Sequence, residues 1–305
     1  MIRRTALMLL ALVSACAISS AQEKPAPKKT VRLFTIGNSF SQDATFFLDD
    51  LAAADGNLLI QKGAFVGGSP LELHWTRAQL NEKDPTDKAG QYNGKGLKDL
   101  LGEDKYDFVT IQQASIKSHN IDTYQPFATN LRDYVKKHAP NAELLLHETW
   151  AYRVDDPRFN VAKPKEGEPK TQKDMYEMLA KSYRTVAGEL GVRLIPVGDA
   201  FWAADNDAQW GYKPDTKFDP KTAKSPELPD QKHSLHVGRK WSKDAKGETT
   251  LGMDGHHSST AGRYLGACVW YEMLFKTSCV GNKFIAGLDA DYARFLQETA
   301  HAAAK

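Results

Sequence analysis

Three residue types that together perform nucleophilic acyl transfer occur in two short stretches of this sequence. Ser39 closes the stretch Gly37-Asn38-Ser39, and Asp254 precedes His257 by three residues in the stretch "DGHHSS". A carboxylate that bonds one imidazole nitrogen fixes the tautomer, which leaves the other nitrogen free to take a proton from a serine hydroxyl. If the fold brings both stretches together, they predict a serine nucleophile with a His-Asp partner pair.

Each stretch also has an ordinary structural explanation. Gly, Asn and Ser are the residues that turns and helix N-caps prefer. An Asp and a His in a loop are often only polar surface. Neither stretch by itself distinguishes a catalytic role from an ordinary turn. The interpretation therefore depends on the elements that position the two stretches.

Those elements alternate between apolar runs and amphipathic stretches with helical spacing. This alternation predicts βαβ units, and therefore an α/β fold with three α/β/α layers around a doubly wound parallel sheet of about five strands. In such sheets the carboxyl ends of the strands share the edge where ligands bind, which is where Ser39 would lie. The predicted strands are 31–36, 58–66, 108–111, 143–147 and 192–197, and the predicted helices are 44–54, 71–80, 97–101, 124–137 and 175–190.

Composition indicates one globular domain over residues 31–305. The chain has 305 residues, 41% hydrophobic, and 40 basic against 38 acidic residues, without a long basic stripe. We therefore expect no nucleic-acid partner. Residues 203–250 form a proline-bearing excursion whose Trp210, Tyr212 and Trp241 predict that it packs on the domain. It either borders a site or is an insertion without a binding role.

The first residues have the layout of an export signal. Arg3 and Arg4 precede an apolar run over 6–13, so residues 1–21 are expected to be a signal peptide and 22–30 a flexible leader. Cleavage after Ala21 is slightly favoured over a lipid anchor at Cys16, which follows a lipobox-like Val-Ser-Ala. No later segment is long and apolar enough to span a bilayer, so we expect a periplasmic or extracellular protein.

The remaining cysteines and one histidine pair suggest no second site. Cys268 lies in the apolar stretch 264–275 and is expected to be a buried small side chain, while pairing with Cys279 stays open. His233 and His236 have a spacing that suits a metal, but no third or fourth ligand is in view. No metal site is predicted.

The motifs also resemble a known family. "IGNSFS", residues 36–41, resembles the first block of the SGNH (GDSL-type) hydrolases, and "DGHHSS" resembles their last block. The likeness is strongest to a bacterial branch with a GNSFS signature and a C-terminal DxxH followed by "G.YL", and it covers residues 31–275. The resemblance implies the SGNH hydrolase fold, Ser39 as nucleophile, His257 as general base and Asp254 as its partner. It implies no metal and no cofactor.

The resemblance also implies an oxyanion hole. Ser39 and Gly68, in "VGGSPLELHW", match positions whose backbone N–H groups stabilise the oxyanion. The family's third block contains an Asn that donates to the same oxygen, but here the predicted strand runs into "QQASIKS". Gln113, or less favourably Gln112, is expected to replace it. The candidates for lining the pocket are Asn38, His74, His147 and His256.

Together these features predict an exported serine esterase that deacylates an esterified carbohydrate. Two alternatives stay open. A sugar O-acyltransferase would use the same catalytic residues, and the missing Asn favours a non-catalytic envelope or glycan-binding protein on the same fold.

Overall fold

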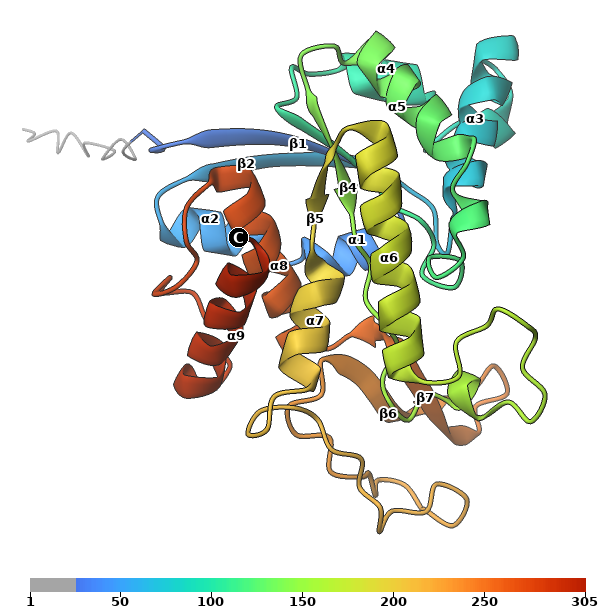
Figure 1. Ribbon diagram of the computed structural model, residues 1–305, viewed down its shortest axis with the longest axis vertical. Helices are drawn as coiled ribbons and strands as arrows, with labels where there is room; N and C mark the ends of the chain where they lie inside the picture. The colour runs from blue at the N-terminus through green and yellow to red at the C-terminus, as the bar shows by residue number, and fades with distance from the viewer. Residues whose placement is uncertain (1–25) are drawn as a thin grey trace, which may run out of the picture.

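The structure is a computed structural model that describes residues 26–305 (Figure 1). The expected signal segment 1–21, with its alternatives of cleavage after Ala21 and lipidation at Cys16, lies outside the described residues. So do residues 22–25 of the expected leader. The first strand begins at Thr30. Within residues 26–305, no helix combines the length and apolarity needed to cross a membrane.

Five parallel strands form the central sheet in the order β2-β1-β3-β4-β5. Each overlaps its predicted apolar run, and the predicted three-layer α/β/α fold with a flavodoxin-like, doubly wound sheet is confirmed. The inner strand β1 pairs with both β2 and β3 and is buried on both faces, which explains its largely apolar sequence. The strands are β1 (Thr30–Gly37), β2 (Leu58–Phe65), β3 (Phe108–Ile111), β4 (Glu143–His147) and β5 (Arg193–Ile195).

Helices cover both faces of this sheet (Figure 1). One face carries α1 (Ser39–Ala44), α2 (Leu48–Ala54), α7 (Val197–Asp205), α8 (Thr260–Phe275) and α9 (Ala290–Ala303). The other carries α3 (Leu71–Lys83), α4 (Leu97–Gly102), α5 (Phe127–His138) and α6 (Gln172–Leu190). Helix α8 is buried almost all round, as its apolar sequence requires. Three short 3₁₀ helices join these elements: η1 (Lys88–Gly90), η2 (Ile121–Thr123) and η3 (Pro157–Asn160).

A β-hairpin follows α7 and was not predicted. Strands β6 (His236–Lys243) and β7 (Thr249–Ser258) form a separate antiparallel sheet at one end of the molecule. Asp254 and His257 therefore lie on β7, the strand that leads into α8, and not in a loop. Strand β6 supports β7 at these positions, because Gly238 pairs with Asp254 and His236 pairs with Ser258, the residue after His257.

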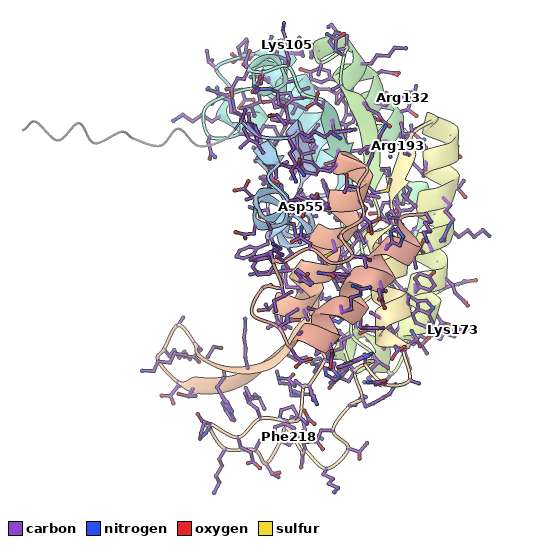
Figure 2. All side chains as sticks on the ribbon, turned by 90° about the vertical axis from the view of Figure 1, so that its left-hand side faces the viewer. Asp55, Lys105, Arg132, Lys173, Arg193 and Phe218 are labelled. Carbon is purple, nitrogen blue, oxygen red and sulfur yellow. The ribbon has the colours of Figure 1, made fainter. Side chains whose placement is uncertain are left out.

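The expected excursion 203–250 packs on the domain through its aromatic residues, and β6 belongs to it. The Trp210 ring stacks 5.3 Å from that of Tyr292 on α9. The guanidinium of Arg153 lies 4.4 Å from the centre of the Tyr212 ring. Beyond these contacts the loop around Phe218 extends away from the sheet (Figure 2).

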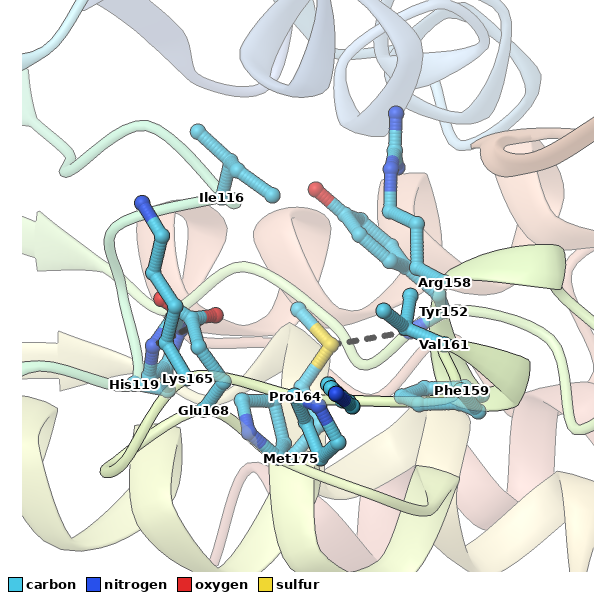
Figure 3. Close-up of a pocket in the computed structure, with 12 residues that line it drawn as sticks. Ile116, His119, Tyr152, Arg158, Phe159, Val161, Pro164, Lys165, Glu168 and Met175 are labelled. Carbon is cyan, nitrogen blue, oxygen red and sulfur yellow. Dashed lines mark hydrogen bonds and ion pairs between the residues drawn. The ribbon is translucent and has the colours of Figure 1, made fainter.

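A second long connection, residues 148–171, joins β4 to α6 and contains η3. It borders a pocket that Figure 3 shows in close-up. Its extent agrees with the gap between the predicted strand 143–147 and the predicted helix 175–190.

Cys268 and Cys279 are both buried and both free. The Cys279 thiol donates to the carbonyl oxygen of Gln297 on α9, with 3.4 Å between sulfur and oxygen. The pairing that the sequence left open is therefore absent between these two residues.

Candidate active site

The turn after β1 presents Ser39 at the carboxyl edge of the sheet. Asn38 is the N-cap of α1, and its side-chain oxygen accepts from the Phe40 N–H at 2.9 Å. Ser39 is the first residue of the helix, so its own N–H points out of the helix end. A Cβ at Gly37 would lie 2.6 Å from the Ser41 hydroxyl oxygen, so this position requires glycine. Both explanations of the stretch thus hold together: it is a capped turn, and the turn exposes a serine.

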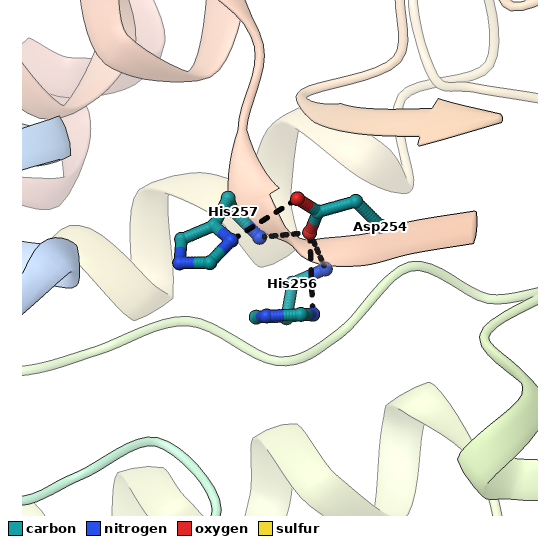
Figure 4. A group of neighbouring side chains, drawn as sticks. All are labelled: Asp254, His256 and His257. Atoms are coloured by element: carbon teal, nitrogen blue, oxygen red, sulfur yellow. Dashed lines mark hydrogen bonds and ion pairs between the residues drawn. The ribbon is translucent and has the colours of Figure 1, made fainter. Parts of the chain in front are cut away.

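The structure brings Ser39, His257 and Asp254 together, although 218 residues separate the first two. The Ser39 Oγ lies 3.0 Å from His257 Nε2. On the other side of the ring, His257 Nδ1 lies 3.1 Å from Asp254 Oδ2 (Figure 4). The backbone N–H of His257 also donates to Asp254 Oδ1 at 3.0 Å. This is the order of contacts that a nucleophile, a general base and an orienting carboxylate need.

The pKa shifts of Asp254 and His257 fit these contacts. Partial burial opposes ionisation of Asp254, but the hydrogen bonds from His257 outweigh it and lower the pKa of the carboxyl below its usual range. The hydrogen bond to Asp254 raises the pKa of His257 above its ordinary 6.5. Asp254 is therefore ionised at neutral pH and stabilises the imidazolium that forms when His257 accepts a proton.

A further carboxylate, Asp43, ties the two halves of this site together. It lies on α1, where one oxygen accepts from the Ser258 N–H at 2.9 Å. The other accepts from Nε of Arg263 at 2.9 Å. The helix that carries Ser39 is thereby linked to the residue that follows His257. Sequence reasoning missed Asp43, although its position four residues after Ser39, on the same helix, was a usable signal.

His256 shares Asp254 with His257. Its Nδ1 lies 3.2 Å from Asp254 Oδ1 (Figure 4). Its ring packs edge-on against Tyr152, with 5.6 Å between centroids. Burial lowers the pKa of His256. One ligand atom each from Asp254, His256 and His257 lie within 4.8 Å of one another, so these three residues could hold a metal ion. Such an ion would take the carboxylate and the imidazole that Ser39 needs.

A pocket of about 210 Å³ opens over Ser39. Its lining includes the predicted residues Asn38, Ser39, Gly68, His256 and His257. Gly68 has a φ of +64° and nothing within 4 Å of the place where a Cβ would stand. Within residues 26–305, the N–H groups of Ser39 and Gly68 have no hydrogen-bond acceptor. Both are available to stabilise negative charge on a bound oxygen.

The structure does not bring Gln113 to this pocket, which corrects its expected role in the oxyanion hole. Its amide NH₂ donates to the carbonyl and hydroxyl oxygens of Thr123 at 2.8 and 3.1 Å. Its amide oxygen accepts from the N–H groups of Leu71 and Ala114. Gln112 is equally occupied, because its NH₂ donates to the Asn38 oxygen at 2.9 Å. Both glutamines satisfy buried polar groups beneath the site.

Two of the histidines expected at the pocket also lie elsewhere. His74 is buried between the hydroxyls of Ser69 and Tyr92, at 2.7 and 2.8 Å. His147 is buried beside the Ser41 hydroxyl, 3.2 Å from its Nδ1. Burial lowers the pKa of His74 to about 4 and that of His147 to about 3, so both are neutral structural groups.

Sequence reasoning missed the hydroxyls of the pocket. Ser115 and Tyr152 line it, and their hydroxyl oxygens lie 3.0 Å apart. The pair was not found because single Ser and Tyr residues carry no pattern.

The two histidines whose spacing suits a metal, His233 and His236, have structural roles. His236 Nε2 lies 3.0 Å from the Ala151 carbonyl oxygen, and the His233 ring packs against Trp210.

Several solved structures are similar to this chain over most of its length. A DUF4886 family protein from Bacteroides uniformis is 25% identical over 90% of this chain and 94% of its own, with a TM-score of 0.67. A protein from Slackia heliotrinireducens described as a provisional SGNH hydrolase is 21% identical over 80% of this chain and 98% of its own, with a TM-score of 0.48. A provisional GDSL-like lipase from Parabacteroides merdae is 16% identical over 81% of this chain and 96% of its own, with a TM-score of 0.43. No curated protein matches this chain.

The family comparison identifies the chain more directly. A family model described as a domain of unknown function matches residues 32–209, from β1 to just beyond α7. The match contains Ser39 and Gly68 and ends before the hairpin that carries Asp254 and His257. Because it spans more than half of the chain, the protein belongs to the DUF4886 family.

Proposed function

We propose that this protein is a serine hydrolase that cleaves carboxylic esters through an acyl-enzyme. The observation that carries the proposal is the chain of contacts from Ser39 through His257 to Asp254, at 3.0 and 3.1 Å. The resemblance of both motifs to the SGNH hydrolases supports it, and so does the position of Ser39 at the carboxyl edge of a doubly wound sheet. The carbohydrate substrate and the export of the protein remain parts of the proposal that rest on the sequence.

In the first half of the reaction, His257 Nε2 takes the Ser39 proton while Oγ attacks the ester carbonyl carbon. The oxyanion that forms is stabilised by the N–H groups of Ser39 and Gly68. When the intermediate collapses, the bond from the acyl carbon to the alcohol oxygen breaks, and His257 returns the proton to that oxygen. The alcohol leaves, and the acyl group stays on Ser39.

In the second half, His257 takes a proton from water while the water oxygen attacks the acyl carbon. The bond to Ser39 Oγ then breaks, the serine regains its proton, and the free acid leaves. The Ser115 and Tyr152 hydroxyls line the pocket over Ser39, and we assign them the place in the oxyanion hole that Gln113 does not fill.

Hydrolysis of a small activated acetate ester tests this proposal. The protein should turn over the ester, and Ser39→Ala should abolish turnover. Ser242→Ala, at an exposed serine on β6, is the matched control and should retain the activity. A serine-directed phosphonate should label Ser39 and neither Ser41 nor Ser69, which are buried and hydrogen-bonded. Equal turnover by the parent and Ser39→Ala would refute the proposal, and product analysis with sugar acceptors would separate hydrolysis from acyl transfer.

A further inference from the structure

A second, larger pocket adjoins the one over Ser39. Its volume is about 430 Å³, within the range of about 300 to 1000 Å³ typical of ligand sites. Ile116, Tyr152 and Arg158 line both pockets, so the two are neighbouring chambers of one site. We call the larger one the outer pocket. Most of its wall comes from the 148–171 connection between β4 and α6.

The outer pocket has apolar walls. Two of its large aliphatic side chains are unusually exposed, Ile116 at 51% and Val161 at 55%. Exposed apolar side chains that gather at a pocket indicate a surface that a ligand covers. The apolar and aromatic lining consists of Ile116, Tyr152, Phe159, Val161, Pro164, Pro169 and Met175.

Positive charges surround these apolar walls. Arg158, Lys163 and Lys165 line the outer pocket, and none of them forms an ion pair within residues 26–305. The one carboxylate of the lining, Glu168, lies 3.4 Å from Nε2 of His119. Figure 3 shows Lys165 and Arg158 on opposite sides of the pocket. The pocket therefore has positive charge to spare for an anion.

Arg158 carries positive charge in the outer pocket and also lines the pocket over Ser39. Its guanidinium lies over the Tyr152 ring, 4.6 Å from the ring centre. Stacking on an aromatic ring holds the planar group while leaving its N–H edge free for a carboxylate. A carboxylate bound there is held beside Ser39.

We propose that the outer pocket binds the alcohol part of the ester, and that this alcohol is an acidic sugar of the uronate type. The apolar walls suit the C–H faces of a pyranose ring, and Arg158 pairs with its carboxylate. The smaller pocket over Ser39 then holds a short acyl group such as acetyl. This inference rests on the proposed function, because it names the substrate class of the same site.

A pair of substrates whose carboxylates are either free or methyl-esterified tests the inference through the rate of acetate release. Acetylated trigalacturonic acid carries free carboxylates, and its methyl-esterified form is neutral. The protein should show kcat/KM at least about tenfold higher for the acid form, because charge-assisted hydrogen bonds to a guanidinium favour the carboxylate. The preference should fall as NaCl rises from 0.05 to 0.5 M.

The variant Arg158→Gln should lose most of this preference, mainly through a higher KM for the acid form. Arg132→Gln is the matched control for net charge: Arg132 lies on α5, pairs with Asp133 and stands at the end of the molecule opposite Phe218 (Figure 2). It should keep the preference. Lys165→Gln provides a second probe of the same pocket, with a smaller expected loss.

The outcomes separate this inference from the proposed function. If the protein hydrolyses the small acetate but shows equal kcat/KM for both trigalacturonates, the outer-pocket inference fails and the esterase proposal stands. Equal losses in Arg158→Gln and Arg132→Gln would also overturn it. Calorimetry with Ser39→Ala and deacetylated trigalacturonic acid tests the pocket without turnover. Binding that Arg158→Gln weakens at least about tenfold supports the inference, and no binding refutes it.

Discussion

At the scale of single residues, the carboxylate of Asp254 sets the proton affinity of His257. Two hydrogen bonds hold the carboxylate against His257, and a third contact comes from His256. Since only neutral imidazole can accept the Ser39 proton, the raised pKa of His257 determines the lowest pH at which the site works.

This arrangement predicts a specific pH profile. We expect kcat/KM for a small acetate to fall as pH decreases through a value above 6.5, the ordinary histidine pKa, because His257 then becomes protonated. In Asp254→Asn the stabilising charge is gone, so the acid limb should move to lower pH. Turnover should also drop by about 1000- to 10,000-fold, because the tautomer is no longer fixed. Measured pH profiles of both proteins check this.

His256→Ala is the control for that experiment. It removes a neighbouring imidazole that also contacts Asp254, whereas the hydrogen bond of the Ser39 hydroxyl goes to His257, so its effect on turnover should be much smaller. An unmoved acid limb in Asp254→Asn, or a larger loss in His256→Ala than in His257→Ala, would contradict the assignment of the base.

How much of the site the sequence could predict differed from residue to residue. The structure brings together Ser39, Asp254 and His257, which the sequence selected by residue type and spacing. Gln113 was misplaced because the direction of a buried amide depends on which nearby backbone groups need partners. Here those are the N–H groups of Leu71 and Ala114, and a sequence does not show them.

At the scale of elements, the parallel strands could be predicted and the hairpin could not. Strands buried on both faces need unbroken apolar runs, and such runs stand out in a sequence. The strands of the β6–β7 hairpin are mostly half-buried or exposed and polar, so they carry no apolar pattern. Yet β6 supports the strand that carries the Asp-His pair, since Gly238 pairs directly with Asp254.

The hairpin predicts an effect of changing Gly238 on both stability and activity. Gly238 has a φ of +72°, and an added Cβ would lie 2.1 Å from atoms of Arg153 and Gln231. We expect Gly238→Ala to lower the free energy of unfolding by about 2–4 kcal/mol. It should also reduce turnover, because β6 must shift and its pairing with β7, which carries Asp254 and His257, is weakened. Thermal melts and acetate hydrolysis measure both effects.

Gly247 offers the matched control in the same hairpin. Its φ is +85°, but no atom lies within 4 Å of an added Cβ. Gly247→Ala should therefore show only the backbone cost of about 1 kcal/mol and nearly full turnover. Identical behaviour of the two variants would mean that the clash at Gly238 does not matter.

At the scale of the whole molecule, the sheet and its buried helices hold the fold without a covalent link between Cys268 and Cys279. Both thiols lie in the core near α8 and α9, where the side chains are almost completely buried. Stability therefore comes from packing, and the redox state of the surroundings should have little influence on it.

This predicts that a reducing agent leaves the melting temperature unchanged. Cys268 and Cys279 should each react with a thiol reagent in denaturant and resist it in the folded protein, because burial keeps the reagent out. Mass spectrometry of the labelled protein counts the reacted thiols. A melting temperature that falls on reduction, or a mass two hydrogens short of the free thiols, would instead reveal a disulfide.

The 148–171 connection has a consequence for how this family can diversify. It builds most of the outer pocket, whereas Ser39, Asp254 and His257 come from α1 and β7. Under the proposed function, the Ser-His-Asp groups and most of the outer-pocket wall thus lie on separate segments of the chain, with Tyr152 as the shared residue. Insertions, deletions or exchanges between Tyr152 and α6 can retune selectivity while the Ser-His-Asp groups stay in place, so relatives with an identical Ser-His-Asp arrangement are free to evolve different specificities.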